Sequence, residues 1–433
     1  MALSAMRNMD FKPTVQVLLG SLLAFPLTYC LNKTTAMGDH RLILLAGVIT
    51  LFSFVMIAYT FFRKHRLNNE PLFYAWSLFA FTSCVDLIIG LELDGHISGF
   101  MEFYFKEGEP YLRTAHGTMI NWWDGTGQFA MYLILITLLA NRRRCHEVCL
   151  YWVGSIGNSM IVLLLGGATG TFKVRGSYFL NIPYVVIPIW AGVRCLRQSN
   201  KTRSQQRLIC KSGYELSLLN RPWDFVFIVL FVLAIAFSLF RGVVALGLDH
   251  DYVKAYLKNY EPYLNDPNMF SKIQMVTYLF YFVPYYVSAI YSLVNPGETW
   301  MSDWAILNAG AAAQSQVVHI FASFHWRTVA SGFGSPTDVF NSPGQVFWYT
   351  NLLLLVVPQL FAWRCYTDQE FFFSVYDGSI TSDRSGRVKY ADVATFSEVT
   401  TKKNSTMTNL VDGVVTSTTQ VEGRVTRSMK KMS

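Results

Sequence analysis

The feature that most constrains this chain is a series of ten apolar blocks, each close to 20 residues long, separated by short polar segments. Because a helix needs about 20 mainly apolar residues to cross a bilayer, each block predicts one membrane-spanning helix. Of all residues, 52% are hydrophobic and 15% charged, whereas a soluble protein has about 25% charged residues. We therefore predict an all-α, polytopic membrane protein, and exclude a soluble enzyme and a β-barrel, whose strands have about ten alternating residues. The expected spans are residues 13–31, 41–62, 72–93, 119–140, 148–167, 178–196, 223–247, 273–294, 303–323 and 346–365.

Basic residues gather in alternate loops between these blocks. Arg7 and Lys12 precede the first block, residues 142–144 follow the fourth, and a basic segment over 194–221 follows the sixth. The intervening loops, such as 94–118, are acidic or mixed. Because basic loops stay in the cytosol, this pattern predicts a cytosolic N terminus, and an even number of spans returns the C terminus to the same side. The net charge of +8 is thus explained by topology, and we expect no nucleic-acid partner.

Two halves of the chain repeat one another. The motif Glu-Pro-Tyr-Leu occurs at Glu109–Leu112 and Glu261–Leu264, and Asn-x6-Pro-x5-Arg-Cys occurs at Asn181–Cys195 and Asn351–Cys365. Because each repeat would hold four helices, the two copies are expected to be parallel. We predict an N-terminal two-helix transmembrane hairpin, a first four-helix module, a basic cytosolic linker, a second four-helix module and a disordered cytosolic tail. Their predicted ranges are 1–70, 71–196, 197–222, 223–365 and 366–433.

The predicted tail differs in composition from the rest of the chain. It is rich in Ser, Thr, Val and charges of both signs, without an apolar face, which is typical of disorder. Lys430 and Lys431 lie at the fourth and third positions from its end. They resemble the dilysine retrieval signal of endoplasmic reticulum residents, which is read on a cytosolic tail.

Ionisable side chains within apolar spans are costly and mark candidate functional sites. Asp86 lies within the third block, and Arg241 occupies the corresponding position of the second module. Two interpretations stay open: these residues form an ion pair between the modules, or Asp86 faces a ligand. Asp124 either lines a pocket or interacts with the start of a helix. Asn181 either lines a pocket or satisfies carbonyls freed by nearby prolines.

Other reactive residue types give weaker signals. His319 is expected to be a satisfied histidine inside the bundle. The seven cysteines show no metal-ligand spacing, and no phosphate-binding glycine loop is present. Cys145 and Cys149, four residues apart beside a basic loop, are interpreted as having no special role, with palmitoylation as the alternative. We expect neither a metal nor a cofactor.

Several long stretches closely resemble the transmembrane 6 superfamily: Phe79–Ser83, Asp86–Ile89, Gly99–Tyr104, Lys106–Gly117, Tyr151–Ser155, Pro183–Tyr184, Trp190–Gly192 and Asp303–Ala305. The resemblance covers about residues 10–370. It implies two EXPERA modules, the four-helix unit shared with the emopamil-binding sterol isomerases and the sigma-two receptor.

The resemblance also implies a location and a function. It implies a protein of the endoplasmic reticulum membrane and the ER–Golgi intermediate compartment, with membrane lipids or sterols as ligands. Such a protein promotes lipidation and secretion of triglyceride-rich lipoproteins and affects lipid-droplet content. The implied protein partners are lipoprotein-assembly and ER-export proteins.

The sterol isomerases carry His-x3-Glu in the first helix of the module, Glu in the second and Asn-x2-Trp in the fourth. Laid on this chain, their His falls on Asp86, its Glu on Gly90, and the second-helix Glu near Asp124, while Asn falls on Asn181 and Trp on Tyr184. In the second module the positions hold Arg241, Ala245, Asn351 and Leu354.

The resemblance thus predicts a ligand-binding site of Asp86, Asp124, Asn181 and Tyr184 in the first module. Asp86 and Asp124 are the candidate catalytic residues. Loss of the His-x3-Glu pair favours lipid binding over catalysis. A sterol Δ8–Δ7 isomerase that moves protons through these membrane carboxylates is the alternative, and a transporter or scramblase is a third class.

Overall fold

The computed structural model describes residues 9–34, 39–63, 66–205, 208–209, 218, 221–295, 297–331, 344–368, 371–372, 374–375, 419–421 and 424–426. The chain divides into two compact units, residues 1–375 and 376–433. In the second unit the described residues form an antiparallel pair of strands, β3 (Thr419–Val421) and β4 (Arg424–Thr426). Lys430, Lys431 and most of the predicted disordered tail lie outside the described residues.

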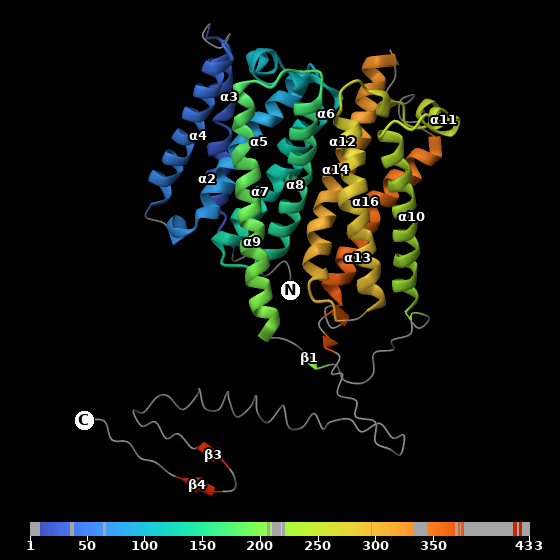
Figure 1. The fold of residues 1–433 in the computed structure, drawn as a ribbon. Coiled ribbons are helices and arrows are strands. Elements are labelled where there is room, and N and C mark those ends of the chain that lie inside the picture. The colour runs from blue at the N-terminus through green and yellow to red at the C-terminus, as the bar shows by residue number, and fades with distance from the viewer. Residues whose placement is uncertain are drawn as a thin grey trace, which may run out of the picture. The chain divides into compact units, whose positions relative to one another are not determined.

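The first unit is built of helices (Figure 1), so the predicted all-α, polytopic class is confirmed. Among the described residues, eight helices are long and apolar enough to cross a membrane. A helix of 23 residues is about 35 Å long, which exceeds the hydrocarbon core of about 30 Å. The eight are Lys12–Asn32, His40–Phe62, Pro71–Leu93, His146–Thr169, Gly176–Ser199, Pro222–Ala245, Phe270–Val294 and Gly344–Thr367.

The other two expected spans, 119–140 and 303–323, are also helical but are not among these eight. The first is continuous through α6 (Ala115–Trp123), η5 (Asp124–Gln128) and α7 (Phe129–Ala140), and the second is α14 (Met301–Ser331). Helix α14 carries polar side chains that are buried in the protein, including Gln314, Gln316 and His319. A helix surrounded by protein can be less apolar than one that faces lipid, which explains the weaker signal.

The N-terminal hairpin consists of α2 (Lys12–Ser21), α3 (Ala24–Asn32) and α4 (His40–Phe62), followed by the short η2 (Arg66–Asn69). Helix α4 begins where the Asp39 carboxylate accepts a hydrogen bond from the Arg41 amide at 2.8 Å. Its outer face is largely exposed, as expected for a helix that faces lipid. In Figure 1 the hairpin, drawn in blue, lies against one side of the bundle.

The predicted first module contains four long helical segments. Pro71 begins the first of them, where the missing amide proton costs nothing. Thr114 caps the second segment by accepting a hydrogen bond from the Gly117 amide at 3.0 Å. The elements of the first module are α5 (Pro71–Leu93), η3 (Tyr104–Gly108), η4 (Pro110–Arg113), the segment α6–η5–α7, α8 (His146–Thr169), η6 (Gly176–Asn181) and α9 (Ile182–Gln205).

The predicted second module follows the same order. Pro222 begins its first helix, as Pro71 begins that of the first module. Its elements are α10 (Pro222–Ala245), α11 (Asp251–Asn259), η8 (Pro262–Asn265), α12 (Phe270–Thr277), η9 (Tyr278–Phe282), α13 (Val283–Val294), α14 and α16 (Gly344–Thr367). Strand β1 (Leu208–Ile209), in the predicted linker, pairs in parallel with β2 (Ser374–Val375).

The repeat is visible in backbone details that the sequence did not reveal. Both second helices contain one five-residue π-helical turn, η5 and η9, which begin at Asp124 and Tyr278. Glu109 and Glu261 adopt nearly the same conformation, with φ and ψ of −125° and 77° for the first and −131° and 62° for the second. The module boundaries themselves stay a prediction.

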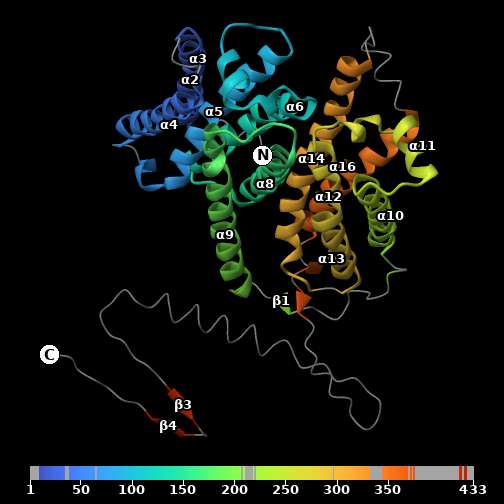
Figure 2. The same ribbon diagram turned by 45° about the horizontal axis from the view of Figure 1, so that its top comes forward.

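The two modules meet along α8 and α14, which lie side by side in both ribbon views (Figures 1 and 2). Gly154 on α8 lies against the backbone of Leu307, and Gly310 on α14 lies against the backbone of Tyr151. A side chain at either glycine would collide with main-chain atoms, so glycine is what allows this close approach.

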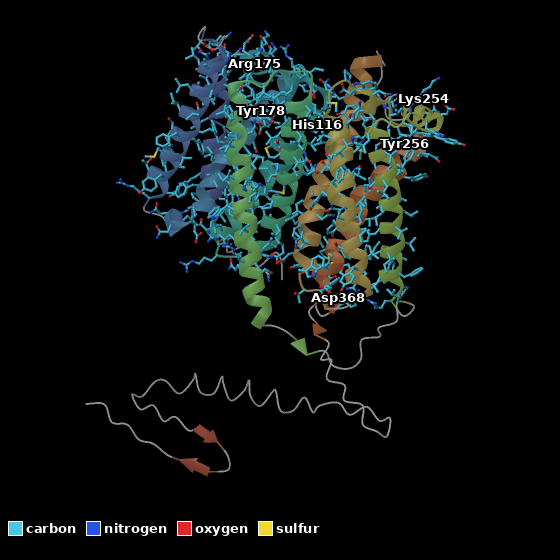
Figure 3. The ribbon with its side chains drawn as sticks, viewed as in Figure 1. His116, Arg175, Tyr178, Lys254, Tyr256 and Asp368 are labelled. Atoms are coloured by element: carbon cyan, nitrogen blue, oxygen red, sulfur yellow. The ribbon has the colours of Figure 1, made fainter. Side chains whose placement is uncertain are left out.

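The two ends of the bundle can be located by labelled side chains in Figure 3. One end holds His116, Arg175, Tyr178, Lys254 and Tyr256, and Asp368 lies at the other.

Candidate functional site

A cavity of about 170 Å³ opens within the first module, between the module helices and the N-terminal hairpin. Its walls are mostly apolar side chains, among them Ile43, Phe81 and Leu163. All four of the predicted ligand-site residues, Asp86, Asp124, Asn181 and Tyr184, line it. None of the described lining residues is Lys, Arg or His.

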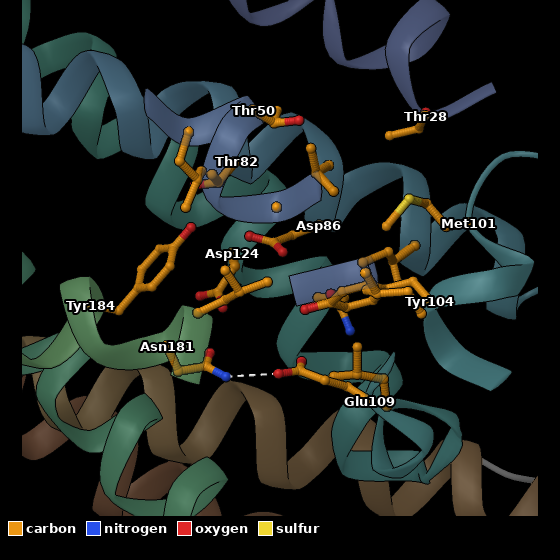
Figure 4. A pocket seen from close by; sticks show the side chains of 18 of the residues that line it. Thr28, Thr50, Thr82, Asp86, Met101, Tyr104, Glu109, Asp124, Asn181 and Tyr184 are labelled. Carbon is orange, nitrogen blue, oxygen red and sulfur yellow. Dashed lines mark hydrogen bonds between the residues drawn. The ribbon is translucent and has the colours of Figure 1, made fainter. Parts of the chain in front are cut away.

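Asp86 projects into this cavity from the middle of α5 (Figure 4). Across the described part of the chain, its carboxyl group forms no hydrogen bond or ion pair. Arg241, its repeat counterpart, is instead bonded within the second module. The interpretation of Asp86 and Arg241 as an ion pair between modules is therefore wrong, and Asp86 faces the cavity.

Asp124 lines the same cavity from the π-helical turn η5. The helical segment begins nine residues earlier at Ala115, where Thr114 is the cap, so the interpretation of Asp124 as a residue at a helix start is wrong. A π-helical turn adds one residue to the helix and redirects the side chains there, and such turns often occur at functional sites. Asp124 and Asp86 both point into the cavity (Figure 4).

Glu109 is a third carboxyl group in the cavity, and the sequence did not single it out as a site residue. It is 4% exposed, and its Oε1 accepts a hydrogen bond from Asn181 Nδ2 at 2.8 Å (Figure 4). Burial raises the pKa of the Glu109 carboxyl to about 7, opposed by hydrogen-bonding groups that include Asn181. Glu109 therefore changes its charge near neutral pH.

The Asn181 side chain holds Glu109 in place and does not satisfy backbone carbonyls freed by the nearby prolines. Its Nδ2 donates to Glu109 and, at 3.2 Å, to the Tyr178 carbonyl. The carbonyls that Pro183 and Pro188 would free lie four residues before each proline, and neither is that of Tyr178. The pocket interpretation of Asn181 therefore fits the structure better.

Tyr184 forms an aromatic wall of the cavity. Its ring stacks on Phe79 with centroids 4.7 Å apart and an interplanar angle of 16°. Its hydroxyl lies beside Thr82, which also lines the cavity (Figure 4). The ring thus offers an apolar face and one polar group to the cavity.

The N-terminal hairpin closes the remaining side. Thr28 of α3 and Ala46, Gly47 and Thr50 of α4 line the cavity. A Cβ atom at Gly47 would lie 2.7 Å from a methyl carbon of Leu180, so the helix and η6 pack tightly at this point. The hairpin is therefore part of the site and not only a membrane anchor.

The corresponding positions of the second module form a closed cluster. Arg241 is completely buried, and its Nε donates to Glu261 Oε2 at 2.9 Å while Nη2 donates to Asn351 Oδ1 at 2.9 Å. His319 Nε2 lies 3.4 Å from the same guanidinium, which confirms His319 as a satisfied bundle histidine. Glu261 and Asn351 are the repeat counterparts of Glu109 and Asn181.

The position of Asp124 is also filled differently in the second module. Tyr278 begins η9 there, is completely buried, and shares hydrogen bonds with Ser315 at 2.7 Å and Gln316 at 2.6 Å. The two modules therefore present the same framework with opposite chemistry. One exposes three carboxyl groups to a cavity, and the other neutralises its carboxylate internally.

No metal centre is seen in the described residues, since no three His, Cys, Asp or Glu side chains are placed to hold an ion. Asp86, Glu109 and Asp124 come from three different elements and share one cavity. Because like charges in an apolar cavity repel one another, the site favours a ligand group that donates hydrogen bonds or carries positive charge.

The family "Transmembrane 6 superfamily member 2-like, transmembrane domain" matches residues 23–206, a range that contains every residue lining the cavity. The mouse protein named Transmembrane 6 superfamily member 2 is 40% identical over 354 residues, which is 81% of this chain and 92% of the mouse protein. The rat protein of that name is 38% identical over 382 residues, 87% of this chain and 99% of its own. The human one is 38% identical over 354 residues, 81% of this chain and 92% of its own. No solved structure matches the chain.

Proposed function

Because the chain belongs to the family of transmembrane 6 superfamily member 2 proteins, we propose that it regulates lipid metabolism by binding a lipid or sterol in the first-module cavity. In this proposal it acts in the endoplasmic reticulum membrane, where it promotes lipidation and secretion of triglyceride-rich lipoproteins. It also affects lipid-droplet content. Its partners are the membrane lipids or sterols themselves, together with lipoprotein-assembly and ER-export proteins.

The observation that carries this proposal is the set of three carboxyl groups in a mostly apolar cavity, at Asp86, Glu109 and Asp124. Small-molecule sites are typically concave and apolar, with a few polar groups that fix the orientation of the ligand. A lipid or sterol offers the matching shape, with an apolar body and a polar end that donates hydrogen bonds. Three carboxyl groups that share a mostly apolar cavity are costly without such a partner.

The second module supports this assignment of chemistry. Arg241 brings a hydrogen-bond donor from the chain itself to Glu261 and Asn351. In the first module Glu109 and Asn181 are present, but Asp86 replaces the donor. Glu109 keeps the hydrogen bond from Asn181 but has no counterpart of the Arg241 guanidinium, and in this proposal the donor group of the ligand takes that place.

Binding is favoured over catalysis for a structural reason. A sterol isomerase needs a group that protonates one carbon and another that deprotonates a second. The glutamate of the isomerase His-x3-Glu motif falls on Gly90, which has no side chain and does not line the cavity. A Cβ atom added at Gly90 would lie 3.4 Å from the Trp122 ring. Purified protein should therefore leave the double bond of an 8-ene sterol unmoved, and turnover abolished by Asp86→Asn would establish the isomerase instead.

The proposed location depends on the tail and the charge pattern. In the proposal both termini are cytosolic, and Lys430 with Lys431 returns the protein from the ER–Golgi intermediate compartment. Replacing both lysines by alanine should move the protein out of the endoplasmic reticulum. An unchanged distribution on fluorescence microscopy would remove this part of the proposal.

Ligand binding is tested with a photoreactive cholesterol analogue and a photoreactive phosphatidylcholine on the full-length protein in nanodiscs. Ala46→Phe places a ring in the cavity and should reduce labelling of cavity-lining peptides at least tenfold. Val48→Phe is the matched control, since Val48 is 50% exposed on the outer face of α4, and should leave labelling unchanged. The probe that labels the cavity identifies a sterol or a phospholipid as ligand, and equal labelling of the two variants would contradict the proposal.

The cellular function is tested in lipoprotein-secreting cells that lack the endogenous protein. Wild-type chain and Val48→Phe should restore triglyceride per secreted particle, whereas Ala46→Phe should not. Full rescue by Ala46→Phe would show that the secretory function does not depend on ligand binding in the cavity. No change in triglyceride per particle with any variant would refute the lipoprotein function itself.

A further inference from the structure

A pair of cysteines lies in contact where α8 and α9 meet. The sulfur atoms of Cys149 and Cys195 are 3.2 Å apart. A disulfide has a sulfur separation of about 2.05 Å, so a small movement of two side chains would join them. Neither cysteine lines the cavity, and Cys195 lies 11 residues beyond the cavity residue Tyr184 on helix α9, about 16 Å along the helix axis.

The two sulfurs differ in access and surroundings. Cys149 is completely buried, whereas Cys195 is partly exposed. The His146 imidazole lies beside Cys195, and its Nε2 is 2.9 Å from Asp303 Oδ1 on α14. Arg194 precedes Cys195 and also acts on it electrostatically. Imidazole and guanidinium neighbours favour the thiolate form of a cysteine, which is its nucleophilic form.

We propose that Cys149 and Cys195 form a redox-active pair that a hydroperoxide converts reversibly into a disulfide. The Cys195 thiolate attacks one peroxide oxygen, the O–O bond breaks, and with one proton Cys195 sulfenic acid and water (or an alcohol) are produced. The Cys149 thiol then attacks the Cys195 sulfur, forming the S–S bond and releasing the sulfenic oxygen as water. The two thiols lose two electrons, which reduce the peroxide. Two external thiols, themselves oxidised to a disulfide, reverse the reaction.

The surroundings of the two cysteines do not resemble a metal site, and a disulfide between them would affect the contact between the modules. In the part of the chain that the structure covers, no group of three potential ligands has metal-binding geometry. The disulfide would tie α9 to α8 next to His146, whose contact with Asp303 joins the two modules. Oxidation therefore acts at the junction of the modules and not in the cavity.

The proposal is tested on the full-length protein in nanodiscs, treated with hydrogen peroxide, alkylated, digested and examined by mass spectrometry. A peptide linked through Cys149 and Cys195 should appear in most molecules and disappear on treatment with dithiothreitol. The buried Cys84 and Cys365 should remain reduced and serve as internal controls. Unlinked Cys149 and Cys195 at a peroxide dose that oxidises the exposed Cys30 would overturn the proposal.

Variants assign the role of each sulfur. Cys149→Ser should leave a sulfenic acid on Cys195 that dimedone traps, whereas Cys195→Ser should abolish both the link and the trapped adduct. Cys145→Ser should leave the link intact. A disulfide between Cys145 and Cys195 in the wild-type protein would contradict the assignment of Cys149.

Discussion

The first helix of each module carries one ionisable residue at the same repeat position, Asp86 in α5 and Arg241 in α10, and the surroundings of the two differ. Arg241 is bonded to Glu261 and Asn351 and is completely buried. Asp86 lines a cavity with Glu109, the counterpart of Glu261. Similar frameworks thus yield a closed cluster in one module and an open cavity in the other, according to which charge the first helix supplies.

A second pair of positions shows the same contrast. In the second module Arg364 Nε lies 3.1 Å from Asp224 Oδ1, whose side chain is 2% exposed. In the first module Arg194 Nη2 lies 3.4 Å from Glu70 Oε2, whose side chain is 39% exposed. Ion pairs in water contribute little, so the buried ion pair of Asp224 in the second module has only a weaker, exposed counterpart in the first. The comparison favours a structural role for the second module and agrees with the binding role that we propose for the first.

The largest expected effect follows from removing the cation of the closed module. Arg241→Ala leaves the Glu261 carboxylate buried without its partner, which should lower the free energy of unfolding by about 3–5 kcal/mol. Thermal unfolding of the detergent-solubilised protein measures this loss. Lys254→Ala, which removes an exposed ion pair with Asp249, should change stability by less than about 1 kcal/mol. A similar midpoint for the two variants would contradict the closed-cluster description.

The stability of the first module should depend on pH, because the Glu109 carboxyl has no guanidinium partner of the kind that Arg241 gives Glu261. Glu109 has a folded-state pKa of about 7 against an ordinary value of 4.5, so the folded state favours its protonated form. Its contribution is fully present below pH 4.5 and is lost as the pH rises through 7, a change of up to about 3 kcal/mol. Unfolding midpoints across this window, compared between wild type and Glu109→Gln, measure it. Glu107→Gln, at a partly exposed neighbour that does not line the cavity, is the control and should keep the wild-type slope. A flat wild-type profile would show that Glu109 is ionised when folded.

A smaller effect is expected where the two modules touch. Gly154→Ala places a methyl group against the Leu307 backbone and should cost about 1–3 kcal/mol through strain. Gly157→Ala on the same helix meets open space and should not destabilise the protein. Chemical unfolding measures the stability of both variants. Because both replace glycine by alanine on α8, the difference between them reports the contact between the modules and not helix propensity. Equal midpoints would mean that α8 and α14 do not depend on this close approach.

Much of the fold follows from sequence because the bilayer allows few solutions. Apolar blocks of about 20 residues can span only as helices, and eight of the predicted ten coincide with long apolar helices. The predicted ligand-site residues Asp86, Asp124, Asn181 and Tyr184 all line one cavity. Their grouping could be predicted because matching motif positions assign each of them to a particular helix of the module. Polar residues within the two remaining spans weakened their apolar signal, and in α14 these residues are buried in protein, out of contact with lipid.

Glu109 illustrates what the sequence could not give. It recurs as Glu261 in the motif that revealed the repeat, but it lies in a loop between spans, where a carboxylate is ordinarily solvated. Its inward position depends on the 3-10 turn η4 and on the hydrogen bond from Asn181, 72 residues away. The pairing of Arg241 with Glu261, and the cavity wall formed by the hairpin, are long-range contacts of the same kind. Recurrence of a charged residue in both repeats was the available signal.

The most direct test of the account is the variant Asp86→Arg, which gives the first module the cation of the second. The guanidinium should reach Glu109 and Asn181 as Arg241 reaches Glu261 and Asn351, and occupy the cavity. Labelling by the photoreactive lipid that marks the wild-type cavity should fall at least tenfold, while the unfolding midpoint should be unchanged or higher. Wild-type labelling in a stably folded Asp86→Arg protein would contradict the claim that this cavity binds the ligand.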